Sequence, residues 1–162
     1  MIPAYATPEW LDTVAKVYRS DPENKKIFKS LSMELCYRIA AEPSLGIDKD
    51  LYFNFKVEAG ELLETRFVTA EEAQKATILM GSSYNIWKKV LTKEDKFVAD
   101  FISKKIALEN GDPAKALTVG PLADPMVNIM TKEGIVWPDE MSSDELEAYK
   151  AKVNAFREKL GV

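Results

Sequence analysis

The strictest pattern in this chain is an alternation of apolar and polar side chains from Leu51 to Glu58. Leucine, two phenylalanines and valine occupy the odd positions, and tyrosine, asparagine, lysine and glutamate occupy the even ones. A period of two residues places these sets on opposite faces of a β-strand, so the segment predicts a strand with one buried face. Such a strand needs neighbouring strands for its backbone groups and a second layer for its apolar face.

A hairpin partner is predicted directly after this strand. The sequence "EAGE" at residues 58–61 is typical of a turn, because its glycine adopts a positive φ without steric cost. Beyond the turn, Leu63, Thr65 and Phe67 alternate with charged residues. We expect this alternation to form the return strand of the hairpin, with Phe67 on the inner face of the sheet.

The segment from Ser32 to Ala41 is compatible with two structures. Met33, Leu35, Tyr37 and Ile39 alternate with polar residues as in a strand, but Phe28, Leu31, Leu35 and Ile39 also follow a helical spacing. We favour the strand, because an antiparallel meander of three consecutive strands then has one apolar and one solvent-exposed face. Short strands at Ile78–Met80 and around Ile106–Leu108 bring the expected number to five.

Several segments begin with residues that favour a helix N-terminus. Thr or Asp followed by Pro suits the cap and the first helical position, and Ser followed by acidic residues suits a capped first turn. These signals occur at Thr7-Pro8, Asp21-Pro22, Asp112-Pro113 and Ser142-Ser143-Asp144, and a further helix is expected from about Glu94. The last helix, at about residues 142–160, carries a single apolar stripe that includes Phe156.

Gly81-Ser82-Ser83 lies between a predicted strand and a predicted helix, where phosphate-binding loops also occur. Such loops use several glycines, whose backbone amides surround the anion, and usually a nearby lysine. This chain has one glycine there and no lysine until Lys88. We therefore interpret the segment as a corner with a serine helix cap.

Composition excludes several classes of function. The chain of 162 residues has no histidine, which removes the commonest general base and every histidine-containing zinc site. Its net charge of −4 and pI of about 5.1 argue against general nucleic-acid binding.

Its single cysteine, Cys36, lies mid-strand away from any run of cations, so we expect a packed thiol and not a nucleophile. The lone cysteine and the lack of a signal peptide or membrane span indicate a cytoplasmic protein. We expect no catalytic residue, no metal site and no cofactor.

The quoted segments "DKDLYFNFKVEAGEL", "TILMGSSYNIWKKVL" and "SKKIALENGDPAKAL" together resemble the sterol carrier protein type-two family, also called nonspecific lipid-transfer proteins. The resemblance covers roughly residues 32–130, and it rests on the order and spacing of these motifs. The segment after Lys132 has no clear counterpart in the family. The resemblance implies one α+β domain over residues 1–162, with a five-stranded, mostly antiparallel sheet, helices packed on one face, and additional N- and C-terminal helices.

The resemblance also implies a non-catalytic protein that binds or transfers a lipid in an apolar tunnel between sheet and helices. The expected ligand is a fatty acyl, acyl-CoA or isoprenoid-like molecule. We expect at most transient contact with a membrane and no binding to nucleic acid. The candidate wall residues are Phe53, Phe55, Phe67, Met80, Trp87, Leu91, Phe101, Met130 and Phe156.

The pattern leaves open whether the two layers enclose a cavity or a filled core, because both use the same apolar residues. If a cavity is present, the C-terminal helix is a candidate lid. If the core is filled, the alternative is a ligand-free interaction module or accessory subunit, in which the C-terminal stripe binds a second copy in a homodimer or another protein. A third alternative is an enzyme whose carboxylates form a site that the sequence does not reveal.

Overall fold

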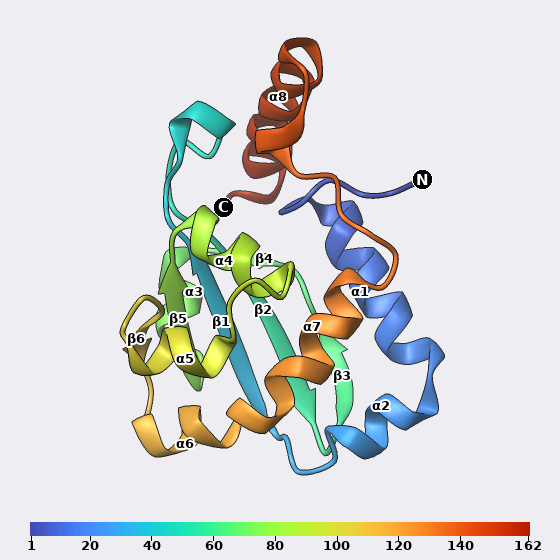
Figure 1. The fold of residues 1–162 in the computed structure, drawn as a ribbon, viewed down its shortest axis with the longest axis vertical. Coiled ribbons are helices and arrows are strands. Elements are labelled where there is room, and N and C mark those ends of the chain that lie inside the picture. Colours follow the sequence, from blue (N-terminus) through green and yellow to red (C-terminus); the bar gives the residue numbers. More distant parts are fainter.

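The computed structural model describes residues 1–162 and contains one mixed β-sheet (Figure 1). Its strands are β1 (Met33–Ile39), β2 (Leu51–Glu58), β3 (Glu61–Glu64), β4 (Phe67–Val68), β5 (Ile78–Ser82) and β6 (Ala107–Asn110). Their order is β3-β2-β1-β5-β6, and β4 also pairs with β2. All pairs are antiparallel except β1 with β5. Since β3 and β4 occupy successive parts of the same edge, the sheet has the five positions predicted from the sequence.

The register of β1 and β2 places their apolar side chains on one face. Leu35 lies opposite Phe55, and Tyr37 lies opposite Phe53. The alternating side chains of both strands therefore project together from the same surface of the sheet. This pairing confirms the strand interpretation of Ser32–Ala41 and the predicted meander.

The return strand differs from its prediction in its first half. Leu62 is buried and Leu63 is 44% exposed, so the alternation expected from Leu63 to Phe67 does not hold at the start of the strand. The strand is interrupted at residues 65–66, where the buried Asn54 side chain accepts a hydrogen bond from the Arg66 backbone N–H at 2.9 Å. A register shift at Lys56/Val57 places Leu62 opposite Val57 and Glu64 opposite Lys56, so that Leu62 and not Leu63 points inward.

Eight helices complete the fold. They are α1 (Pro8–Ser20), α2 (Pro22–Ile27), α3 (Ala70–Gln74), α4 (Tyr84–Leu91), α5 (Phe97–Ile102), α6 (Pro113–Thr118), α7 (Ala123–Thr131) and α8 (Ser143–Leu160). Three short 3₁₀ turns are η1 (Pro43–Leu45), η2 (Gly120–Leu122) and η3 (Pro138–Glu140). The main apolar cluster combines the inner face of the sheet with buried side chains of α1, α4, α6, α7 and α8.

The predicted helix starts are confirmed by their caps. The side chains of Thr7, Asp21, Asp112 and Ser142 each accept a hydrogen bond from a backbone N–H in the first turn of the helix that follows. The fifth helix, α5, begins at Phe97, slightly later than the predicted start near Glu94. Helix α3 was not predicted, and its Ala73 packs in a small second cluster with Cys36 on the opposite face of the sheet.

Helix α8 stands at one end of the molecule beside the N-terminal segment (Figure 1). Its apolar stripe is buried against the same chain through Tyr149, Val153 and Phe156. The Tyr149 hydroxyl donates a hydrogen bond to the Tyr5 carbonyl at 2.7 Å, and the Phe156 ring stacks on Phe67 with 4.9 Å between centroids. The stripe therefore has its partner within the domain.

Candidate functional site

An internal cavity of about 60 Å³ lies between the sheet and the helices. All eighteen residues that line it are apolar or aromatic. They are Tyr5, Trp10, Phe28, Leu31, Leu35, Tyr37, Phe53, Met80, Trp87, Val90, Leu91, Phe97, Val119, Leu122, Ala123, Met126, Val127 and Met130. The helical layer and the sheet thus do not close completely on one another, and the space that remains is apolar.

Two indole rings in the cavity wall are held by hydrogen bonds to the backbone. Trp10 Nε1 donates to the Met130 carbonyl at 3.0 Å and thereby ties α1 to α7. Trp87 Nε1 donates to the Arg38 carbonyl at 2.9 Å and ties α4 to β1. Because both indole N–H groups are satisfied inside the protein, the rings present only their apolar surfaces to the cavity.

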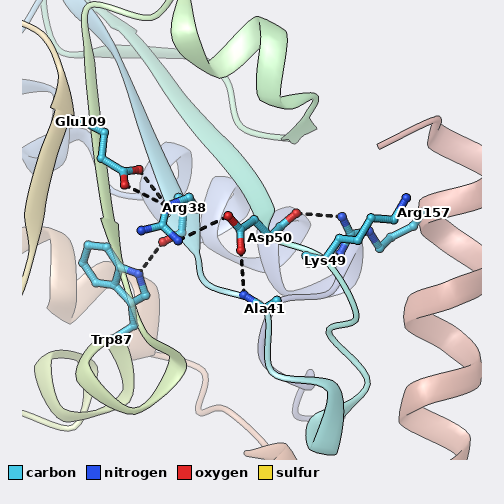
Figure 2. Close-up of polar contacts among 7 residues, drawn as sticks. All are labelled: Arg38, Ala41, Lys49, Asp50, Trp87, Glu109 and Arg157. Atoms are coloured by element: carbon cyan, nitrogen blue, oxygen red, sulfur yellow. Dashed lines mark hydrogen bonds and ion pairs between the residues drawn. The ribbon is translucent and has the colours of Figure 1, made fainter.

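Strand β1, whose Arg38 carbonyl accepts the hydrogen bond from Trp87, is itself fixed by an ion-pair network (Figure 2). The Arg38 guanidinium donates from Nε to both Glu109 carboxylate oxygens at 2.8 and 3.0 Å, and its Nη1 lies 3.4 Å from Asp50 Oδ2. The Asp50 carboxylate also accepts from the Ala41 backbone N–H at 2.8 Å. Arg157 of α8 donates to the carbonyls of the same loop. These contacts link the sheet edge, the β1–β2 loop and α8.

The Gly81-Ser82-Ser83 corner has a structural role, as the sequence predicts. The Ser83 hydroxyl accepts from the Ile86 backbone N–H and caps α4, and the Ser82 hydroxyl donates to the Lys105 carbonyl at 2.7 Å. A Cβ atom on Gly81 would lie 2.5 Å from Glu109 Oε1 and 2.7 Å from Arg38 Nε. The glycine therefore leaves room for the ion pair to lie close above the strand.

Two tyrosine hydroxyls in the cavity wall have no hydrogen-bond partner in the protein. Tyr18, Tyr84 and Tyr149 donate to Gly60, Asp139 and Tyr5, respectively. Tyr5 and Tyr37, which line the cavity, make no side-chain hydrogen bond. Burial raises the pKa of both phenols above the ordinary value, so both hydroxyls stay neutral.

The structure brings five of the nine predicted wall residues together. Phe53, Met80, Trp87, Leu91 and Met130 line the cavity. Phe55 is buried beside it, with its ring 6.0 Å from that of Tyr37. Phe67 and Phe156 stack on each other under α8, and Phe101 lies in an external groove. Contact of any of these residues with a ligand stays a prediction.

Sequence reasoning missed the contribution of the N-terminal region. Tyr5 and Trp10 lie in the wall because residue 4 pairs with residue 136 and α1 crosses the apolar face next to α7. The tryptophan at position 10, on the apolar side of a well-capped helix, was a signal for burial. Nothing in the local pattern indicated which distant elements it would meet.

An external groove between α5 and α6 adjoins the cavity. It is lined by Phe97, Val98, Phe101, Ala116, Leu117, Gly120 and Pro121. Phe97 also belongs to the wall of the internal cavity, so it borders both spaces. The exposed side chains of Val98, Ile102 and Leu117 make the outer surface of this region apolar.

The buried thiol has the environment expected of an unreactive residue. Cys36 is fully buried in the second cluster, and burial raises the pKa of its thiol to about 12, with nearby Glu34 adding to the effect. Since the thiolate is the reactive form, we predict that iodoacetamide at pH 8 does not label the native protein but labels it fully in guanidinium chloride. Rapid labelling of the native protein would show that this face of the sheet is open.

None of the helices combines the length and apolar character needed to cross a bilayer.

Comparison with known proteins identifies the fold. No protein-family model matches the sequence, and no curated protein matches it. The structure is similar to a conserved hypothetical protein of Thermus thermophilus, with a TM-score of 0.71 and 15% identity over 80% of this chain and 90% of that one. A crystal structure of sterol carrier protein 2 gives a TM-score of 0.68 and 15% identity over 76% of this chain and 95% of that one. Sterol carrier protein 2 from Yarrowia lipolytica, in its apo form, gives 0.52 and 10% identity over 80% and 95%. Over most of its length, the chain has the fold of sterol carrier protein 2.

Proposed function

We propose that this protein binds a lipid non-catalytically in the apolar space between its sheet and its helices. The observation that carries the proposal is a cavity whose entire lining is apolar or aromatic, at the position where the two layers meet. Its rings and thioether side chains suit an aliphatic guest, because methionines adapt their shape at little cost. The similarity to sterol carrier proteins supports the same assignment.

Lipid binding requires the cavity to expand. Its volume of about 60 Å³ is well below the roughly 300–1,000 Å³ that ligand pockets typically measure. Burial of an alkyl chain contributes about 0.8 kcal/mol per methylene, or roughly 9 kcal/mol for a twelve-carbon chain. This gain is large enough to offset an outward movement of short surface helices.

The α5–α6 region is the part of the cover that we expect to move. Helices α5 and α6 have six residues each, and each buries only one residue of its own. Segments with few buried contacts belong to the low-stability end of a fold. We infer that the lipid passes from the external groove to the cavity when the Phe97 ring swings aside.

A pair of substitutions at Phe97 tests this route. Phe97→Ala should speed the uptake of a fluorescent lipid several-fold by removing the ring between groove and cavity, and Phe97→Trp should slow it. Stopped-flow fluorescence measures the rates, with Trp10 and Trp87 in the cavity wall as energy donors. Leu63→Ala, at an exposed position on β3 outside both the groove and the cavity, is the control and should leave the rate unchanged. Equal rates in all variants would exclude Phe97 as the barrier.

The proposal itself is tested on protein purified without detergent. Extraction with organic solvent followed by mass spectrometry should release about one lipid per chain, or the stripped protein should bind an added lipid saturably at one site. A protein that carries no lipid and binds none would refute the proposal.

The structure gives no support to an interface through the stripe of α8, because Tyr149, Val153 and Phe156 are buried within this chain.

A further inference from the structure

The wall of the cavity contains one hydroxyl that is well placed to meet a ligand. Tyr37 projects from the middle of β1, where its ring stacks on Phe53 at 5.1 Å and meets Trp87 edge-on at 5.6 Å. The side chain is partly buried and borders the cavity. No side chain or backbone group of the chain hydrogen-bonds to its hydroxyl.

The Tyr37 hydroxyl is not among the fully buried side-chain atoms that lack a partner, so it keeps accessible surface. Facing apolar side chains without a protein partner, it is free to bond an atom that enters the cavity. Phenylalanine would fill the same position without a polar group to satisfy, and the neighbouring strand carries phenylalanine at positions 53 and 55. A ligand atom that pairs with the hydroxyl would supply the missing partner.

The charges around the cavity restrict what this ligand atom can be. None of the lining residues is a lysine, an arginine or an acid. A carboxylate or phosphate placed beside Tyr37 would therefore lose its hydration without gaining a counter-charge, which is strongly unfavourable. A neutral hydroxyl or carbonyl oxygen can accept the phenolic hydrogen without this penalty.

We propose that the Tyr37 hydroxyl anchors an uncharged hydroxyl or carbonyl oxygen of the bound lipid deep inside the cavity. This inference rests on the proposed function and adds to it the ligand class, which is neutral oxygen-bearing lipids in preference to free carboxylates. Tyr5 carries the other unpartnered hydroxyl of the wall, but its ring is almost fully covered, with 1% exposure. Tyr37 is therefore the primary anchor.

The test compares ligands of equal chain length in the wild type and in Tyr37→Phe. 1-Dodecanol, 2-dodecanone and dodecanoate are each used to displace the neutral fluorescent probe N-phenyl-1-naphthylamine. We expect the wild type to bind the alcohol and the ketone more tightly than the carboxylate at pH 8. Tyr37→Phe should weaken the alcohol and the ketone by about 3- to 10-fold, which is the worth of one hydrogen bond. The affinity of the probe is measured separately for each variant, so that the displacement constants can be compared.

An infrared spectrum gives a readout that a purely structural role would not change. The carbonyl stretch of bound ¹³C-labelled 2-dodecanone should lie at a lower frequency in the wild type than in Tyr37→Phe, because the phenol polarises the bond. The thermal stability of Tyr37→Phe without ligand should equal or exceed that of the wild type. Tyr149→Phe is the matched control, because it removes a tyrosine hydroxyl that has a backbone partner. It should lower stability and leave the ligand preference unchanged.

The outcomes separate this inference from the function on which it rests. If no lipid binds to the wild type, the proposed function fails and the anchor fails with it. If lipids bind but Tyr37→Phe shows unchanged affinities and an unchanged carbonyl frequency, only the anchor is refuted. Tighter binding of dodecanoate, or loss of the preference in Tyr5→Phe instead of Tyr37→Phe, would also overturn it.

Discussion

Val127→Phe should abolish lipid binding while the protein remains folded. Val127 lies on α7 with 8% exposure and lines the cavity. A phenyl ring at this position would occupy the cavity of about 60 Å³ and remove the space from which a larger pocket opens. We expect the affinity for N-phenyl-1-naphthylamine to fall at least tenfold, with a change in stability within about 1–3 kcal/mol, the usual cost of overpacking.

The measurement is a fluorescence titration combined with thermal unfolding of the same samples. Ile27→Phe is the matched control, because it adds a similar ring at a position on α2 that is 44% exposed and outside the cavity. This control should bind the probe as the wild type does. A folded Val127→Phe protein with undiminished affinity would show that the probe binds elsewhere.

Phe156→Ala should cause the largest loss of stability among single substitutions in α8. The Phe156 ring is 8% exposed and stacks on Phe67, next to the buried Tyr149 and Val153. Truncation of a buried phenylalanine typically costs about 3–5 kcal/mol, and we expect about 3 kcal/mol here. For a domain of this size, this corresponds to a decrease in Tm of roughly 6–12 °C.

Leu160→Ala, at a position on α8 that is 49% exposed, is the control and should change stability by less than about 0.5 kcal/mol. The same variants test the lid hypothesis. No residue of α8 lines the cavity, so a lid function of this helix would have to act through the Phe67 contact. Faster release of lipid from Phe156→Ala than from Leu160→Ala would support a lid. Equal release rates, with the stability loss present, would restrict α8 to a structural role.

Local signals in the sequence predicted most of the architecture. The period of two in Leu51–Glu58 determined which side chains face the helices, since the register with β1 preserves the alternation. Helix starts followed from caps whose hydrogen bonds are local, as at Thr7 and Ser142. Such features depend on neighbours within a few residues, and the chain alone specifies them.

Features that depend on distant partners were not predictable in the same way. The inward position of Leu62 in place of Leu63 depends on the register shift between β2 and β3 at Lys56/Val57. Tyr5 lies in the cavity wall because residue 4 pairs with residue 136. The cavity is a small space left between two large apolar layers. The residue types do not show whether the side chains of these layers fill that space completely.

The most direct test of a lipid site in the cavity uses the six methionines as reporters. Met80, Met126 and Met130 line the cavity, whereas Met1, Met33 and Met141 do not. The protein is labelled with [¹³C-methyl]methionine, and 1-dodecanol is added up to one equivalent while methyl NMR spectra are recorded. We predict saturable shifts of the three cavity methyls at one equivalent, with nuclear Overhauser contacts to the alkyl chain, and nearly constant signals from the other three. Unchanged cavity methyls in the presence of excess lipid, or shifts confined to Met1, Met33 and Met141, would contradict the account.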